Sequence, residues 1–259
     1  MRTAGWLLTV LTVLACAALA SGCGGDDGRS GGATRLVVSA ASSMTRALET
    51  CAPKFGEAEN ADVKLSVAGS DELAAQIRQG ARVDVYAAAN TALPDELYGD
   101  DLLEKPVEFA TNELVLAVPQ SSGVRSVGDL TKEGTKVVIG SESVPIGAYT
   151  REVLAKLPPG GEKAILANVR SNEPDVKGIV GKLHQGAADA GFVYVTDVSA
   201  SGGELESIEL PKELEPQVTY GAGVVMKAEQ PDLARRFVDG LTHGGCAGAL
   251  RRAGFGPPP

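Results

Sequence analysis

Four short junctions in this chain place a hydroxyl or an unencumbered backbone amide after an apolar run, where a helix should begin. They are Ser39–Met44, Val67–Glu72, Val144–Tyr149 and Glu173–Gly178. A helix N-terminus offers unpaired N–H groups and a partial positive charge. Several such termini converging on one cleft would bind an anion without any lysine or arginine. The junctions therefore indicate oxyanion capture.

The elements that must position these junctions alternate along the chain as short apolar strands and helical patterns. One series runs from 36–39 to 94–98, and a second runs from 136–139 to 207–208. Such alternation is typical of mostly parallel sheets flanked by helices on both faces. Two longer apolar strands, 113–119 and 217–226, bracket the second series. The pattern predicts an α/β protein of two lobes whose chain crosses the hinge twice.

The predicted crossings define the domain organisation. We place lobe one at residues 33–112 plus 222–259, and lobe two at residues 113–221. Ligands of open α/β sheets bind beyond the carboxyl ends of the strands. Each lobe supplies two of the four junctions, so we expect the site in the cleft between the lobes.

The N-terminal residues read as an export signal over residues 1–22. Arg2 supplies positive charge, and the apolar stretch 6–20 is too short to span a membrane comfortably. The run Leu19-Ala20-Ser21-Gly22-Cys23 is similar to a lipobox, which predicts acylation of Cys23. The alternative is an ordinary cleaved signal in which Cys23 is incidental. Residues 23–32 are rich in glycine and predict a flexible tether.

The charge of the chain is acidic, with a net charge of −9 that becomes −10 once residues 1–22 are removed. An acidic surface argues against nucleic acid as a partner. It does not exclude an anionic ligand, because surface charge is screened over roughly 8 Å and a closed cleft is governed by local dipoles. We expect a monomer that meets the membrane only through its lipid anchor.

Two cysteines, Cys51 and Cys246, remain after the signal segment is removed and Cys23 is acylated. Unpaired thiols are uncommon in an oxidising compartment. The residues alone leave two possibilities open, a disulfide or two buried free thiols.

A set of fragments in one order resembles the periplasmic molybdate-binding proteins of ABC transporters, which are type II solute-binding proteins. The resemblance covers the chain from about Thr34 to Phe255. Its fragments are Ala41-Ser42, Ala68-Gly69-Ser70 with Leu73–Ile77, Val144–Tyr149, Asp175-Val176, Phe192-Val193-Tyr194 and Gly254-Phe255.

The resemblance implies a two-lobed periplasmic-binding-protein fold and a ligand set for molybdate, with tungstate as a second ligand. The ligand-binding residues it implies are Ser42, Ser70, Ile146, Val176 and Tyr194, of which Ile146 and Val176 would act through backbone amides. It also favours a Cys51–Cys246 disulfide, because the family fold returns the C-terminal helix to the first lobe. The implied partners are an ABC permease and its ATPase subunit. No cofactor and no metal other than that of the bound oxyanion is expected.

Other interpretations of the same residues stay open. Ser42 and Ser70 could be helix N-caps, and Tyr194 could be a core tyrosine bonded to a carbonyl. The ligand could be sulfate or another oxyanion. The chain could also be a periplasmic enzyme that uses Ser70 or Tyr194 on an anionic ester, but no catalytic motif is visible, so we expect a binding protein and not an enzyme. A neutral donor set predicts an affinity nearly independent of pH between about 6 and 8.5.

Overall fold

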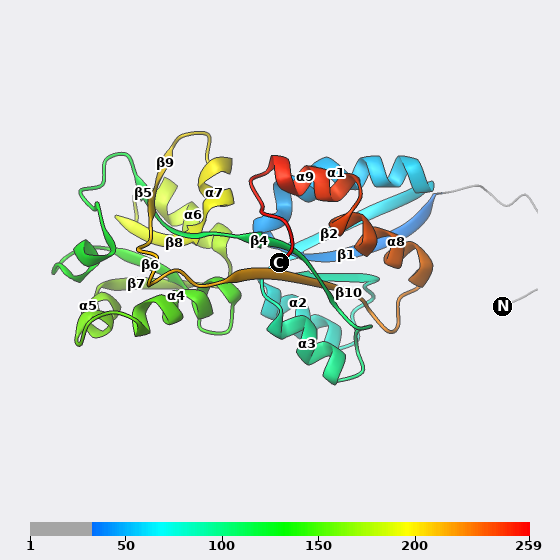
Figure 1. The fold of residues 1–259 in the computed structure, drawn as a ribbon, viewed down its shortest axis with the longest axis horizontal. Helices are drawn as coiled ribbons and strands as arrows, with labels where there is room; N and C mark the ends of the chain where they lie inside the picture. Colours follow the sequence, from blue (N-terminus) through cyan, green and yellow to red (C-terminus); the bar gives the residue numbers. More distant parts are fainter. Residues whose placement is uncertain (1–32) are drawn as a thin grey trace, which may run out of the picture. The chain divides into compact units, whose positions relative to one another are not determined.

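The computed structural model describes residues 33–259 of the chain. The predicted signal peptide (1–22), the tether (23–32) and the acylation site at Cys23 lie outside the described residues. No helix within 33–259 is long and apolar enough to cross a membrane. Two five-stranded sheets, each with helices on both faces, organise this part of the chain (Figure 1).

The first sheet has the strand order β2-β1-β3-β10-β4. Its strands are β1 (Thr34–Ala41), β2 (Ala61–Ala68), β3 (Val85–Ala88), β4 (Val107–Asn112) and β10 (Val218–Val224). Around it lie the 3-10 helix η1 (Ser42–Met44) and the helices α1 (Thr45–Glu59), α2 (Ser70–Arg78), α3 (Ala92–Gly99), α8 (Pro231–Thr242) and α9 (Gly245–Arg252). Helices α1, α8 and α9 cover one face and α2 and α3 the other (Figure 1). The central strands β3 and β10 are therefore buried at every position.

The second sheet has the strand order β7-β6-β8-β5-β9. Its strands are β5 (Leu114–Pro119), β6 (Val137–Gly140), β7 (Val169–Glu173), β8 (Ala190–Tyr194) and β9 (Leu205–Glu209). Its helices are the 3-10 helix η2 (Val127–Thr131), α4 (Pro145–Ala155), α5 (Gly161–Asn168), α6 (Val176–His184) and α7 (Val195–Ala200). Helices α6 and α7 lie on one face, and α4 and α5 lie on the other (Figure 1). Strands β6 and β8 are buried throughout.

The predicted two-lobed α/β fold is confirmed, but its sheets are mixed and not mostly parallel. Strand β1 runs parallel to β2 and β3, whereas β10 is antiparallel to β3 and β4. In the second sheet, β6 is parallel to β7 and β8, whereas β5 is antiparallel to β8 and β9. The chain enters each of the strands β5 and β10 directly after it has passed from the other lobe. They enter their sheets without the helical crossover that keeps neighbouring strands parallel.

The chain crosses between the sheets at Glu113 and again within residues 210–217. Strand β10 pairs with β3 and β4 of the first sheet. The lobe boundary that we predicted between 221 and 222 therefore falls inside a first-lobe strand. Because the chain leaves the second sheet after β9, we propose lobes of 33–112 plus 218–259 and of 113–217.

The C-terminal helices pack on the first lobe, against α1. Cys51 in α1 and Cys246 in α9 form a disulfide, with their Cα atoms 5.0 Å apart. Phe55 of α1 and Phe237 of α8 meet edge to face, with ring centroids 5.0 Å apart. The last helices are thus joined to the first helix by a covalent bond and by aromatic packing.

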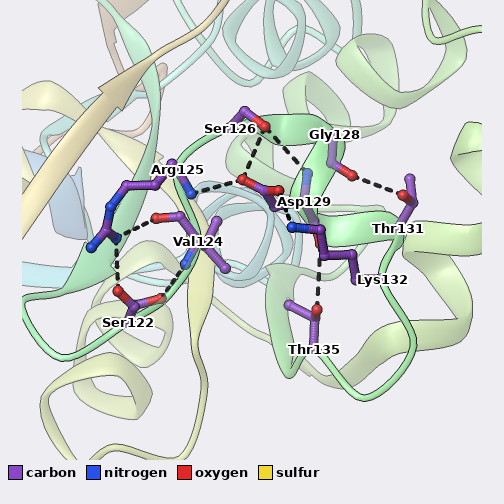
Figure 2. A network of polar contacts seen from close by, with 9 residues as sticks. All are labelled: Ser122, Val124, Arg125, Ser126, Gly128, Asp129, Thr131, Lys132 and Thr135. Carbon is purple, nitrogen blue, oxygen red and sulfur yellow. Dashed lines mark hydrogen bonds and ion pairs between the residues drawn. The ribbon is translucent and has the colours of Figure 1, made fainter.

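A polar network holds the loop between β5 and β6 (Figure 2). The Asp129 carboxylate accepts the backbone N–H of Arg125 (2.9 Å) and the hydroxyl of Ser126 (3.1 Å) and pairs with Lys132 (2.6 Å). The ion pair with Lys132 and these hydrogen bonds hold the pKa of the Asp129 carboxyl well below its usual range. The network organises the segment that leads into β6, a strand that ends beside the third junction.

Candidate anion-binding site

A cavity between the two lobes is lined by strand ends and by the starts of the helices that follow them. The first lobe contributes Ala41, Ser42, Ser43, Ala68, Gly69, Ser70 and Ala89. The second lobe contributes Val144, Pro145, Ile146, Asp175, Val176 and Tyr194. All five residues predicted to bind the ligand therefore lie around one cavity, and their contact with a ligand stays a prediction.

The size of the cavity limits what it can hold. Its volume is about 20 Å³, far below the roughly 300–1,000 Å³ of pockets that bury drug-sized organic ligands. In this arrangement of the lobes, a space of this size suits one compact ion and has no room for a sugar or a nucleotide.

The two first-lobe serines occupy the first positions of helices. Ser42 begins η1 after β1, and Ser70 begins α2 after β2, so that the N-cap positions belong to Ala41 and Gly69. Neither N-cap residue has a capping side chain, which leaves the first N–H groups of both helices without a partner from their own cap. The N-cap interpretation of the serines is wrong for this reason.

Neighbouring groups of the first lobe orient Ser70. Its hydroxyl oxygen accepts the backbone N–H of Ala89 at 3.2 Å, and its carbonyl accepts the hydroxyl of Tyr86 at 2.7 Å. Because the Ser70 oxygen already accepts a hydrogen bond, its own proton can be donated into the cavity. Ser70 is 2% exposed, so this arrangement lies away from bulk water.

The second lobe presents backbone amides. In α4, Pro145 has no N–H, and the first helical bond runs from the Ala148 N–H to the Val144 carbonyl (2.9 Å). The N–H of Ile146 therefore has no helical acceptor. In α6, the Asp175 side chain caps the N–H of Gly178 (3.0 Å), which leaves the N–H of Val176 without a cap.

Tyr194 carries the clearest unmet hydrogen bond of the site. Its side chain is 1% exposed, and its hydroxyl has no partner among the described residues. Such a buried, unpaired hydroxyl costs free energy unless a ligand accepts its proton. Burial raises the pKa of the Tyr194 hydroxyl well above its usual value, so the group remains a neutral donor. Tyr194 is thus a core tyrosine, but its hydroxyl is not bonded to a carbonyl of the described residues.

Sequence reasoning missed a hydrogen-bonded network next to the cavity. Ser43 lines the cavity and shares a hydrogen bond with the hydroxyl of Tyr220 in β10 (2.9 Å). Asn112, at the first crossing, donates from Nδ2 to Tyr220 (3.3 Å) and to Thr196 of the second lobe (2.9 Å). The partners are 84 to 177 residues apart in sequence, so no local pattern could have indicated them.

The electrostatics of the cavity come from dipoles and neutral donors. Among the described residues that line it, none is a lysine, an arginine or a histidine. Its acidic lining residue, Asp175, is engaged by the N–H of Gly178 in its own helix. Converging helix starts and hydroxyls can stabilise an anion, because the partial positive charge of each N-terminus faces it.

Fold and site together define a class: a two-lobed protein whose inter-lobe cavity suits a small anion. The sequence matches the family model described as bacterial extracellular solute-binding protein over residues 36–256. The chain therefore belongs to the bacterial extracellular solute-binding proteins.

Two similar proteins are named for the ligand that they bind. A protein of Mycobacterium tuberculosis (strain ATCC 25618 / H37Rv), named molybdate-binding protein ModA, is 35% identical over 231 residues, which cover 88% of this chain and 86% of the relative. The structure of the Azotobacter vinelandii periplasmic molybdate-binding protein matches with a TM-score of 0.77 at 20% identity, over 86% of this chain and 100% of that chain. These findings confirm the resemblance seen in the sequence.

The fold alone does not select the oxyanion. The sulfate-binding protein SubI from Mycobacterium tuberculosis H37Rv matches with a TM-score of 0.72 at 15% identity, over 86% of this chain and 87% of that chain. At such identity the similarity concerns the fold only. The choice of ligand must therefore be argued from the site and from the more similar relative.

Proposed function

We propose that this protein captures molybdate, and tungstate with it, in the inter-lobe cavity and delivers the ion to an ABC permease and its ATPase subunit. The observation that carries the proposal is the donor set. Uncapped helix starts and the unpaired Tyr194 hydroxyl surround a small cavity whose described lining has no cationic side chain. The name of the Mycobacterium tuberculosis relative supports molybdate as the ligand.

The donor set favours an ion that is fully deprotonated at neutral pH. Phosphate retains a proton near pH 7, and its buried O–H would need an acceptor. The carboxylate on the lining, Asp175, accepts the Gly178 N–H through Oδ1 alone, so exclusion of phosphate requires that its second oxygen stay turned away from the ion. Sulfate has the charge and shape of molybdate, so the protein must separate these two ions by size through a cavity held rigid by its backbone.

An enzymatic role is not supported by the geometry of the two hydroxyls that could serve it. The Ser70 oxygen accepts a backbone N–H from Ala89, and the Tyr194 hydroxyl has no partner among residues 33–259. Neither hydroxyl is bonded to a histidine or a carboxylate that could act as a general base. We infer that the chain is a binding protein without catalytic activity.

Export and anchoring complete the proposal. A signal over residues 1–22 followed by Cys23 supports acylation and retention at the extracytoplasmic face of the cell membrane. One acyl chain gives only marginal attachment, so more than one chain is expected on Cys23. The exported protein would work as a monomer.

Titration calorimetry with molybdate, tungstate, sulfate and phosphate tests the function. Molybdate and tungstate should bind at one site per chain, phosphate should not bind, and sulfate should compete only at much higher concentration. Each bound ion should raise the melting temperature by mass action. Sulfate stabilisation equal to that by molybdate at the same concentration would favour a sulfate-binding protein, and turnover of an anionic ester would favour an enzyme.

A further inference from the structure

Gly69, the N-cap residue of α2, lines the cavity at a place where the first lobe faces Pro174 and Val144 of the second lobe. Its backbone has φ −60° and ψ 139°, an ordinary extended conformation that any residue adopts. The chain therefore does not need glycine here for its conformation. The reason for glycine must be space.

The space around Gly69 is closed by the other lobe. A Cβ atom added at this position would lie 2.4 Å from the carbonyl oxygen of Pro174, which precedes the cap of α6. Real Cβ atoms essentially never approach closer than 3.0 Å, and ordinary van der Waals contact begins at 3.4 Å. A methyl group at residue 69 would therefore have to push the second lobe away by about 1 Å.

The other neighbours of Gly69 could adapt. The Asp71 Oδ1 atom, 2.9 Å from the added Cβ, is the end of a side chain that can rotate, and Val144 Cγ1 at 3.5 Å is in normal contact. The rigid obstacle thus belongs to the second lobe and not to the lobe that holds Gly69. With the lobes apart, an alanine at this position would fit.

We propose that Gly69 sets how closely the lobes can approach, so that first-lobe and second-lobe donors reach the same ion. Hydrogen bonds of about 2.9 Å that lengthen by 1 Å are no longer hydrogen bonds. Alanine at position 69 would thus separate Ser42 and Ser70 from Ile146, Val176 and Tyr194. Gly69 is a positioning residue that donates nothing through a side chain.

The experiment compares wild type, Gly69→Ala and Gly99→Ala, with molybdate as the probe. Gly99 lies in α3 of the same lobe, and an added Cβ there meets nothing within 4 Å. Calorimetry gives the affinity, stopped-flow tyrosine fluorescence gives the rates, and melting without ligand gives the stability of each variant.

For Gly69→Ala we expect an unchanged association rate, because the open form is intact. The melting temperature without ligand should change only slightly, since the cost of alanine at an N-cap is offset by the smaller entropy of the unfolded chain. The dissociation rate should rise and the affinity fall by about tenfold or more, since the binding-competent closed state becomes rare. Gly99→Ala should bind as the wild type does.

Because molybdate is the probe, the inference rests on the proposed function, and the two can fail separately. A wild type that binds no molybdate would overturn the proposed function and this inference with it. A wild type that binds molybdate and a Gly69→Ala variant with the same affinity and dissociation rate would overturn the inference alone. An association rate that falls together with the affinity would also overturn it, because the obstacle would then act within the open first lobe.

Discussion

At the scale of single residues, the partner of each hydroxyl decides its role. Tyr86 and Tyr194 are both fully buried, but the Tyr86 hydroxyl donates to the Ser70 carbonyl (2.7 Å) whereas the Tyr194 hydroxyl has no partner among the described residues. Tyr86 therefore stabilises the first lobe, and Tyr194 retains an unused donor for a ligand.

Substitution of these two tyrosines should have opposite effects. Tyr194→Phe should lower the molybdate affinity by about ten- to a hundredfold, since a hydrogen bond to a charged oxygen contributes about 1.5–3 kcal/mol. Its stability without ligand should be unchanged or higher, because an unpaired buried hydroxyl is removed. Tyr86→Phe should instead cost roughly 1 kcal/mol of stability. Calorimetry measures the affinity and denaturant unfolding measures the stability of each variant. An affinity of Tyr194→Phe equal to that of the wild type would show that Tyr194 does not contact the ligand.

The carboxyl of Asp197 gives the protein a pH dependence that its sequence did not predict. Asp197 is only half-buried, and this partial burial raises the pKa of its carboxyl to about 7, although the N–H of Tyr194 (3.1 Å) and the charge of Lys177 lower it, and the charge of Asp175 raises it further. The unfolded carboxyl titrates near 3.8, so the folded state holds an extra proton between that pH and about 7. Stability without ligand should therefore fall as the pH rises towards 7 and then level off.

Melting scans between about pH 5 and 8.5 test this pH dependence, with Asp197→Asn as the matched variant. The asparagine oxygen can still accept the Tyr194 N–H. The variant should therefore differ from the wild type only in lacking the pH-dependent part of the stability. The molybdate affinity is then no longer expected to be independent of pH, because an ionised Asp197 next to the Tyr194 backbone repels a dianion. Molybdate should bind more weakly above pH 7 than below it, and equal pH profiles for wild type and Asp197→Asn would contradict the assignment.

At the scale of elements, the site is built from the starts of helices that follow buried strands. Three of the four helix starts have no side-chain cap, and the fourth is capped by Asp175. Asp175 therefore has two opposite effects, because it stabilises α6 by capping it and places a negative charge beside a cavity for an anion.

Two substitutions of Asp175 separate these effects. Asp175→Asn should keep the cap, since asparagine caps as well as aspartate, and should raise the molybdate affinity several-fold by removing a charge. Asp175→Ala should also remove the cap and cost about 0.5–2 kcal/mol of stability. Calorimetry at low salt measures the effect of the charge on affinity, and melting measures the effect of the cap on stability. A weaker affinity in Asp175→Asn would show that the carboxylate contacts the ligand favourably.

The sequence predicted the elements that have strong apolar patterns and the junctions that follow them. It missed β4, β7 and the short helices α5 and α7. Strand β7 alternates half-buried and exposed residues, a weak signal for an edge strand. The mixed sheets were missed because strand direction depends on how the chain returns from the other lobe. Ser43 was missed because its partner, Tyr220, is reached only through the fold.

At the scale of the whole molecule, the described chain starts and ends in the first lobe. Strand β1 begins at Thr34, and α9, near the C-terminus, is bonded through Cys246 to Cys51 of α1. Within residues 33–259 the polypeptide passes between the lobes only at the two crossings, which suits a protein whose lobes move about those segments.

Loss of the disulfide should destabilise the protein and leave the site intact. The bond closes a loop of 195 residues, and a typical contribution of such a bond is roughly 2–5 kcal/mol. Cys51→Ala combined with Cys246→Ala should lower the free energy of unfolding by that amount, while the molybdate affinity of the folded protein stays unchanged. Both thiols reacting with an alkylating reagent in the unfolded, unreduced wild type would contradict the bond.

The central claim is that one small oxyanion is held by neutral donors from both lobes. Anomalous diffraction from crystals grown with tungstate tests it most directly, because the metal marks the position of the ion. We predict one strong anomalous peak in the inter-lobe cavity, with oxygens of the ion within hydrogen-bond distance of the Ser42, Ser70 and Tyr194 hydroxyls and of the Ile146 and Val176 amides. A peak bound to lysine or arginine side chains, or to one lobe only, would contradict the account.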